Sequence, residues 1–147
     1  MRIRRIMTLG AVLALTGAVT ATSAQIVDGQ GAPYDQSRFV PLNPDRPNGI
    51  AIITLKGDPA TGPSDMLMRF GPAPAVMHSH TADYRLVVIS GEMKHWVQGQ
   101  AEADVGTLGP GAYWYQPGGQ PHVDICLTDS CVMFLSWLGA RDVQVTP

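Results

Sequence analysis

The chain has 147 residues, of which 45% are hydrophobic and 15% charged, and its formal net charge is −2 at pH 7. This length suits one domain with a hydrophobic core large enough to fold without several cross-links. The sequence has no basic stripe and no interleaving of aromatic with basic residues, so a nucleic-acid partner is not expected.

The first 24 residues have the three parts of an export signal. Arg2, Arg4 and Arg5 form a basic start, residues 6–19 are apolar or small, and residues 21–24 are small enough for cleavage after Ala24. The apolar stretch is shorter than the roughly 20 residues that span a bilayer. We therefore expect a signal peptide over 1–24 and a periplasmic or secreted mature protein without a membrane anchor. Seven basic residues then remain against twelve acidic ones.

The mature chain divides into a short arm and one β-domain. Residues 25–48 are rich in Gly, Pro, Asp and Asn, which predicts an extended, loosely ordered arm. From 49 to 147, short apolar runs alternate with Gly/Pro turns, which is typical of an antiparallel sandwich or barrel. The fold class is therefore predicted as all-β. Strands are expected at 50–56, 65–70, 76–80, 84–90, 93–98, 112–116, 122–127 and 132–138.

The most informative pattern is a set of three histidines. His78 and His80 are two residues apart, so on a strand they point to the same face. His122 follows a turn rich in Pro and Gly at 116–121, where a second strand could bring it opposite the pair. Three imidazoles can hold a divalent ion and leave positions for water or substrate, although a barrel that has lost its metal would keep the same pattern. We interpret the fourth histidine, His95, as a surface or satisfied core residue.

Cys126 and Cys131 are the only cysteines. An oxidising compartment favours a disulfide between them, which would join the two strands of a hairpin. Along an uninterrupted strand, however, Cys126 would lie on the same face as His122 and could be a soft fourth ligand. Free thiols are the remaining alternative.

The histidines lie within motifs that resemble those of the cupin superfamily. The second cupin motif, Gly-x5-Pro-x-Gly-x2-His-x3-Asn, is matched except at its last position, which is a cysteine here. The matching residues are Gly111, Pro117, Gly119 and His122, with Cys126 in place of the asparagine.

The first cupin motif, Gly-x5-His-x-His-x3-4-Glu-x6-Gly, is matched by His78, His80 and Gly91. The spacing from Gly71 is one residue longer than usual, and Tyr84 stands where the family has its glutamate. The string from His78 to Tyr84 is similar to that of small exported cupins of unassigned function with a His-Thr-Ala-Asp-Tyr pattern.

The resemblance implies a single jelly-roll barrel of two antiparallel sheets, with His78, His80 and His122 as metal ligands. Without the usual carboxylate, the ion would keep more of its positive charge and would be a stronger Lewis acid. We expect Tyr84 to donate a hydrogen bond or a proton beside the metal. Asp83 is the alternative catalytic residue. If residues 81–83 form a turn, the alternation of side chains along a strand does not decide whether Asp83 or Tyr84 faces the metal. The ion would be Fe²⁺, Zn²⁺, Mn²⁺, Ni²⁺ or Cu²⁺.

The function expected from the sequence is that of an exported, metal-dependent enzyme acting on a small molecule. Iron would favour a dioxygenase-like oxidoreductase, whereas zinc or nickel would favour an isomerase or a lyase. A non-catalytic periplasmic module that binds a metal or a small ligand is the main alternative. A structural barrel that pairs as a homodimer through an edge strand is the third.

Overall fold

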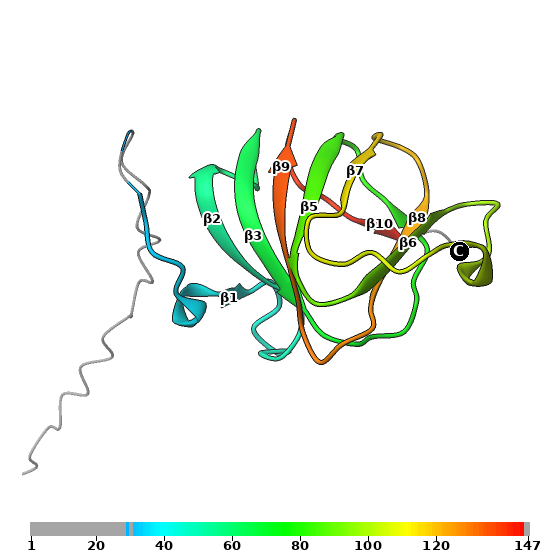
Figure 1. The fold of residues 1–147 in the computed structure, drawn as a ribbon. Coiled ribbons are helices and arrows are strands. Elements are labelled where there is room, and N and C mark those ends of the chain that lie inside the picture. The colour runs from blue at the N-terminus through cyan, green and yellow to red at the C-terminus, as the bar shows by residue number, and fades with distance from the viewer. Residues whose placement is uncertain (1–28, 30, 146–147) are drawn as a thin grey trace, which may run out of the picture.

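The computed structural model describes residue 29 and residues 31–145, so the predicted signal peptide at 1–24 lies outside the described residues. The described chain forms ten strands and two short 3₁₀ helices (Figure 1). In chain order they are η1 (Gln36–Arg38), β1 (Val40–Pro41), β2 (Ala51–Gly57), β3 (Ser64–Phe70), β4 (His78–Ser79), β5 (Tyr84–Ser90), β6 (Met93–Val97), η2 (Glu102–Asp104), β7 (Tyr113–Gln116), β8 (His122–Cys126), β9 (Cys131–Trp137) and β10 (Gln144–Val145). Neither of these helices is long and apolar enough to cross a membrane.

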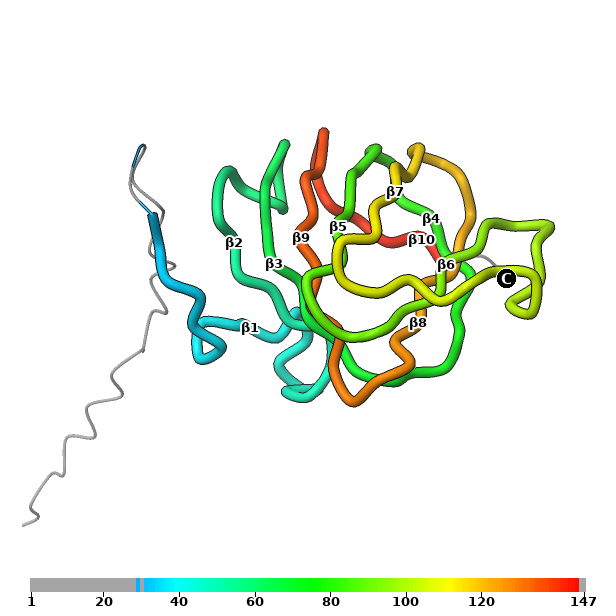
Figure 2. The backbone as a smooth tube through the Cα atoms, viewed as in Figure 1, coloured from blue at the N-terminus to red at the C-terminus, as the bar shows by residue number. Residues whose placement is uncertain are grey.

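The strands form two antiparallel sheets, and the tube in Figure 2 follows the path of the chain through them. One has the order β1-β2-β3-β9-β5-β7 and the other the order β10-β4-β8-β6. From β3 onward, successive strands lie in alternate sheets, so the chain repeatedly crosses from one sheet to the other. Neighbours within a sheet, such as β3 and β9, are therefore distant in sequence. The prediction of an all-β fold is confirmed, and the two sheets are consistent with a cupin jelly roll.

The core lies between the sheets, and it is apolar along most of the strands and polar at one end. Alternate residues of β3, β5 and β9 face inward, as strand geometry requires. Met66, Leu86 and Met133 belong to its apolar part. The end of β9 instead brings Trp137 against Tyr84, and the buried histidines lie beside this pair. A barrel that buries polar side chains at one end has the arrangement of a binding site.

The structure agrees with the predicted strands except at the edges. β5 spans Tyr84–Ser90 as predicted, whereas the strand expected at 76–80 shortens to His78–Ser79. The sequence reading missed β1 and β10, each two residues long. Val40–Pro41 lies in the arm predicted as loosely ordered and pairs with β2. Two-residue strands carry no periodicity, so only their partners reveal them.

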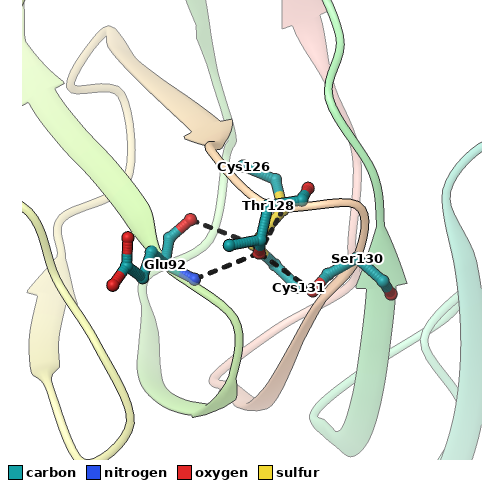
Figure 3. The surroundings of a disulfide bond; sticks show 5 residues. All are labelled: Glu92, Cys126, Thr128, Ser130 and Cys131. Atoms are coloured by element: carbon teal, nitrogen blue, oxygen red, sulfur yellow. Dashed lines mark hydrogen bonds between the residues drawn. A yellow bond between two sulfur atoms is a disulfide. The ribbon is translucent and has the colours of Figure 1, made fainter.

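Cys126 and Cys131 form a disulfide, which rules out the alternative of Cys126 as a metal ligand (Figure 3). The expected hairpin is wrong, because β8 and β9 belong to different sheets and the disulfide therefore links the two layers. Thr128 accepts a hydrogen bond from the Glu92 backbone N–H at 3.3 Å and stabilises the same turn.

Gly91, the last glycine of the first motif, packs directly beside this disulfide. It has a φ of +85°, and a Cβ there would lie 2.6 Å from the Ser130 carbonyl oxygen and 2.8 Å from the Cys131 sulfur. A residue with a side chain would therefore be both strained and sterically blocked.

Candidate metal centre

The three histidines come together through one pairing between short strands. His78 of β4 lies directly opposite His122 of β8, and His80 follows two residues later on the same face. One ring nitrogen of each lies within 4.8 Å of the other two. Ring centroids are 4.4 Å apart for His78 and His122 and 5.2 Å apart for His80 and His122. The cluster expected from the motif is therefore present.

Each of these imidazoles is oriented by a backbone carbonyl at its Nδ1 atom. His78 contacts the Val76 oxygen at 2.9 Å and His122 the Gln120 oxygen at 3.0 Å. His80 makes the same contact with the Asp142 oxygen. A carbonyl only accepts hydrogen bonds, so Nδ1 carries the proton and, in the neutral ring, Nε2 keeps its lone pair. This backing by a carbonyl is common among metal-binding histidines, and the donor set therefore fits a divalent ion.

Burial keeps His80 and His122 neutral. Desolvation lowers the pKa of His80 to about 4, against the hydrogen bond to Asp142, which raises it. Desolvation also lowers the pKa of His122, although the nearby Asp124 carboxylate opposes this. Both rings are thus in the protonation state that binds metals at neutral pH.

The turn of the second motif is docked onto the loop that follows His80. The Gly119 N–H donates to the His80 carbonyl at 2.7 Å, and the Gly118 N–H donates to an Asp83 carboxylate oxygen at 2.7 Å. A Cβ at Gly118 would lie 2.3 Å from the Thr81 carbonyl oxygen. These contacts hold the two motifs together and so place His80 and His122 relative to each other.

Asp83 belongs to this turn rather than to the histidine cluster. Its carboxylate accepts hydrogen bonds from the Tyr115 hydroxyl and the Gly118 N–H, which together lower its pKa. The placement gives Asp83 a positioning role and does not support the catalytic role expected of it as the alternative to Tyr84.

Tyr84 reaches the cluster. It is the first residue of β5 and is 1% exposed. Its hydroxyl lies 3.1 Å from Nε2 of His122 and 3.4 Å from an Asp124 carboxylate oxygen. Burial, and then the negative charge of Asp124, raise the pKa of the phenol. Tyr84 is therefore a neutral hydrogen-bond donor beside the histidines.

Asp124 is a site residue that the sequence reading missed. One of its oxygens lies 3.6 Å from Nε2 of His122, and the other lies 2.8 Å from Nδ1 of His95. Burial raises its pKa, but the hydrogen bond and charge of His95 outweigh this and the net shift is downward. The signal was available, because His122 and Asp124 have the same two-residue spacing as His78 and His80.

His95 is half-buried, stands opposite Asp124 in the β6–β8 register, and stacks on Trp114 with a centroid distance of 4.8 Å. It thus fits the interpretation of a satisfied core residue, with Asp124 as the partner that satisfies it.

The site opens into a cavity of about 690 Å³, a size typical of small-molecule sites. His78, His80, Tyr84 and Asp124 form part of its wall. Most of the remainder is apolar and includes Met68, Phe70, Leu86, Met133, Leu135 and Val143. Residues from the N-terminal arm, from the segment 71–76 and from 141–145 also contribute to it.

Residues 32–144 match the family described as a domain of unknown function, DUF4437. The chain belongs to this family. No protein of curated function matches it.

Solved structures show the fold of this DUF4437 protein to be that of RmlC-like cupins. One is an RmlC-like cupin from Shewanella frigidimarina, with 18% identity, a TM-score of 0.56, and coverage of 73% of this chain and 87% of that one. KdgF from Halomonas sp. has 19% identity and a TM-score of 0.51, over 68% and 86% of the two chains. The DMSP lyase DddQ from Ruegeria pomeroyi has 20% identity and a TM-score of 0.53, over 67% and 51%. At such identities the likeness concerns the fold alone.

Proposed function

We propose that this DUF4437 cupin is a divalent-metal enzyme that acts on a small molecule by non-redox, Lewis-acid chemistry of the lyase or isomerase type. The observation that carries the proposal is the set of three imidazoles, each with Nδ1 bound to a carbonyl, of which His78 and His80 line a cavity. His78, His80 and His122 would hold the ion. Bound there, the ion would supply Lewis acidity toward a substrate oxygen.

Tyr84 supports non-redox chemistry over dioxygenation. Its phenol stays protonated because burial and Asp124 raise its pKa, so it can donate a hydrogen bond to negative charge that develops on a substrate. Full transfer of its proton would be costly beside the Asp124 carboxylate. We therefore assign Tyr84 to charge stabilisation and Asp124 to orienting the hydroxyl. One of the similar solved structures is a lyase by name, which is compatible with this assignment.

A non-catalytic metal- or ligand-binding module is the second candidate. One observation favours it. Asp124, the acidic residue in the described wall of the cavity, is already paired with His95, and its pKa is lowered. It would therefore be a weak general base. Such a module would bind ion and ligand without forming product.

The test of the metal centre is direct measurement of ion binding. Chelator-treated protein is titrated with Zn²⁺, Mn²⁺, Ni²⁺, Fe²⁺ and Cu²⁺, and bound metal is quantified by elemental analysis and calorimetry. We expect one ion per chain and at least a hundredfold loss of affinity in His78→Ala and His122→Ala. The matched control is His95→Gln, which alters the histidine outside the cluster and should retain one ion. Undiminished binding in the two alanine variants would show that the cluster is not the site.

Catalysis is tested separately on metal-loaded protein, with product formation from small carbonyl and carboxylate compounds followed by NMR and oxygen uptake followed by electrode. Turnover without oxygen consumption supports the lyase or isomerase assignment. Oxygen consumption coupled to turnover would replace it with dioxygenation. Ion binding with no product from any compound would favour the binding module.

A further inference from the structure

We propose that the cavity binds a small organic carboxylate with an apolar body and that Arg141 holds its carboxylate group. The inference deepens the proposed function by naming a ligand class, and it rests on that function only for the orientation of the ligand toward the histidines.

Arg141 is fixed at the edge of the metal centre. It lies between β9 and β10, its backbone N–H donates to the Pro59 carbonyl at 2.8 Å, and its side chain lines the same cavity as His78 and His80. The next residue, Asp142, provides the carbonyl that orients His80. The charge of Arg141 is close enough to contribute to the lowered pKa of His80. Its position is therefore tied to the site by the backbone.

The guanidinium forms no ion pair within the described part of the chain, although the charge of the adjacent Asp142 opposes the effect of burial on its pKa. Its Nε atom is buried without a hydrogen-bond partner. The adjacent Asp142 carboxylate is occupied, because it accepts from the Thr81 N–H at 2.8 Å and from Gln144 at 3.2 Å. A buried guanidinium nitrogen without a hydrogen-bond partner is costly unless a ligand supplies the missing acceptor.

The rest of the described wall adds an unpartnered donor and a second positive charge. Trp137 also lines the cavity, and its indole N–H is buried without a partner. Arg46 adds a second, exposed cation. Asp124 is the acidic residue among the described lining, and it is paired with His95. An anionic ligand fits this imbalance.

A carboxylate fits better than a phosphate. A guanidinium presents a planar fork that matches the two oxygens of a carboxylate. A phosphate monoester would bring about two charges and three oxygens, whereas the buried end of this cavity offers one guanidinium. The apolar walls favour a hydrocarbon or aromatic body over a sugar. With its carboxylate on Arg141, such a ligand would place its neighbouring carbons against His80 and Tyr84.

The experiment compares 4-phenylbutanoate with 4-phenylbutanamide, which has nearly the same shape but no charge, on the purified mature protein by calorimetry. We expect the carboxylate to bind at least tenfold more tightly than the amide. Arg141→Gln should reduce this preference at least tenfold, and Arg141→Lys should restore part of it. The control Arg85→Gln, which removes an exposed arginine of β5, should leave the preference unchanged.

Two outcomes would overturn the proposal, namely equal binding of acid and amide by the unaltered protein, and a preference that survives Arg141→Gln. Tighter binding of phenyl phosphate than of 4-phenylbutanoate would overturn the carboxylate class. If Arg141→Gln does not fold, Arg141→Lys decides alone, because loss of the bidentate fork should still lower the preference measurably. The His78→Ala/His122→Ala double variant separates the two proposals, since it removes the ion while the contribution of Arg141 remains.

Discussion

At the scale of single residues, the site depends on protonation states that burial sets. Desolvation keeps His80 and His122 unprotonated, while burial and the charge of Asp124 keep Tyr84 protonated. At neutral pH the two imidazoles therefore offer lone pairs and the Tyr84 hydroxyl offers a hydrogen, and none of these groups has to change its charge first. This arrangement fits the proposed binding of an ion and the proposed stabilisation of charge on a substrate.

Replacing Tyr84 by Phe tests its role without changing the shape of the core. The variant loses the contacts of the hydroxyl with His122 and Asp124, so we expect about 1 kcal/mol of lost stability. Ion affinity should change little, while turnover should fall by about 10²-fold, as for the loss of one donor to developing charge. Calorimetry and steady-state kinetics measure the two effects, with Tyr115→Phe as the matched control. Loss of ion binding in Tyr84→Phe would instead make the phenol a ligand.

The pKa of His80 predicts how the stability of the metal-free protein depends on pH. Its folded pKa of about 4 lies below its ordinary value of 6.5, so between these values the unfolded chain binds the proton more readily. The free energy of unfolding should therefore fall as pH drops from about 6.5 to about 4, by at most on the order of 1 kcal/mol per pH unit. Urea unfolding at pH 7, 5.5 and 4.5 measures this. A His80→Gln variant should show a flatter dependence, and equal slopes in both proteins would contradict the assignment.

At the scale of elements, the centre is assembled by contacts between short strands and turns. β4 is only two residues long, and β8 on one side and β10 on the other hold it in place. The Pro/Gly turn before β8 adds hydrogen bonds to the loop after β4. The relative positions of the three histidines therefore depend on the contact between this turn and the loop after β4. Gly118 permits that contact because it has no side chain.

Gly118→Ala tests that docking. The added methyl group would clash with the backbone oxygen of Thr81, so we expect a loss of about 1–3 kcal/mol in stability and weaker ion binding. The matched control is Gly106→Ala, where the new Cβ meets nothing within 4 Å. Thermal unfolding and metal titration measure both variants. Unchanged ion affinity in Gly118→Ala would mean that the turn does not position His122.

The disulfide should stabilise the barrel without supporting the metal centre. Its loop is short, with a sequence separation of 5, so chain entropy predicts a contribution of about 2 kcal/mol. Reduction should therefore lower the free energy of unfolding by about this amount while one ion remains bound. Denaturant unfolding with and without a reductant measures the change in stability, and elemental analysis measures the bound ion. Metal loss on reduction would contradict this separation.

At the scale of the whole molecule, export stays a prediction from the first 24 residues; the disulfide between the two sheets is of a kind that persists in oxidising compartments. We predict that expression with residues 1–24 in place yields a periplasmic or secreted protein whose first residue is Gln25, within a few residues. Cell fractionation and N-terminal mass spectrometry measure this. A chain that keeps Met1 and stays in the cytoplasmic fraction would show that the leader is not processed.

The amino-acid sequence alone was enough to predict the β-class, most strand positions and the histidine cluster, because two-residue alternation and glycine-bounded turns are local properties. The same alternation would have found Asp124 had it been applied to His122. Only the tertiary structure decided that Asp83 binds a turn, that β8 and β9 lie in different sheets, and that Asp142 orients His80. It alone placed Arg141 in the cavity as well. The contact between Asp142 and His80, for example, joins residues 62 apart, and chain folding, rather than local preference, determines which distant groups meet.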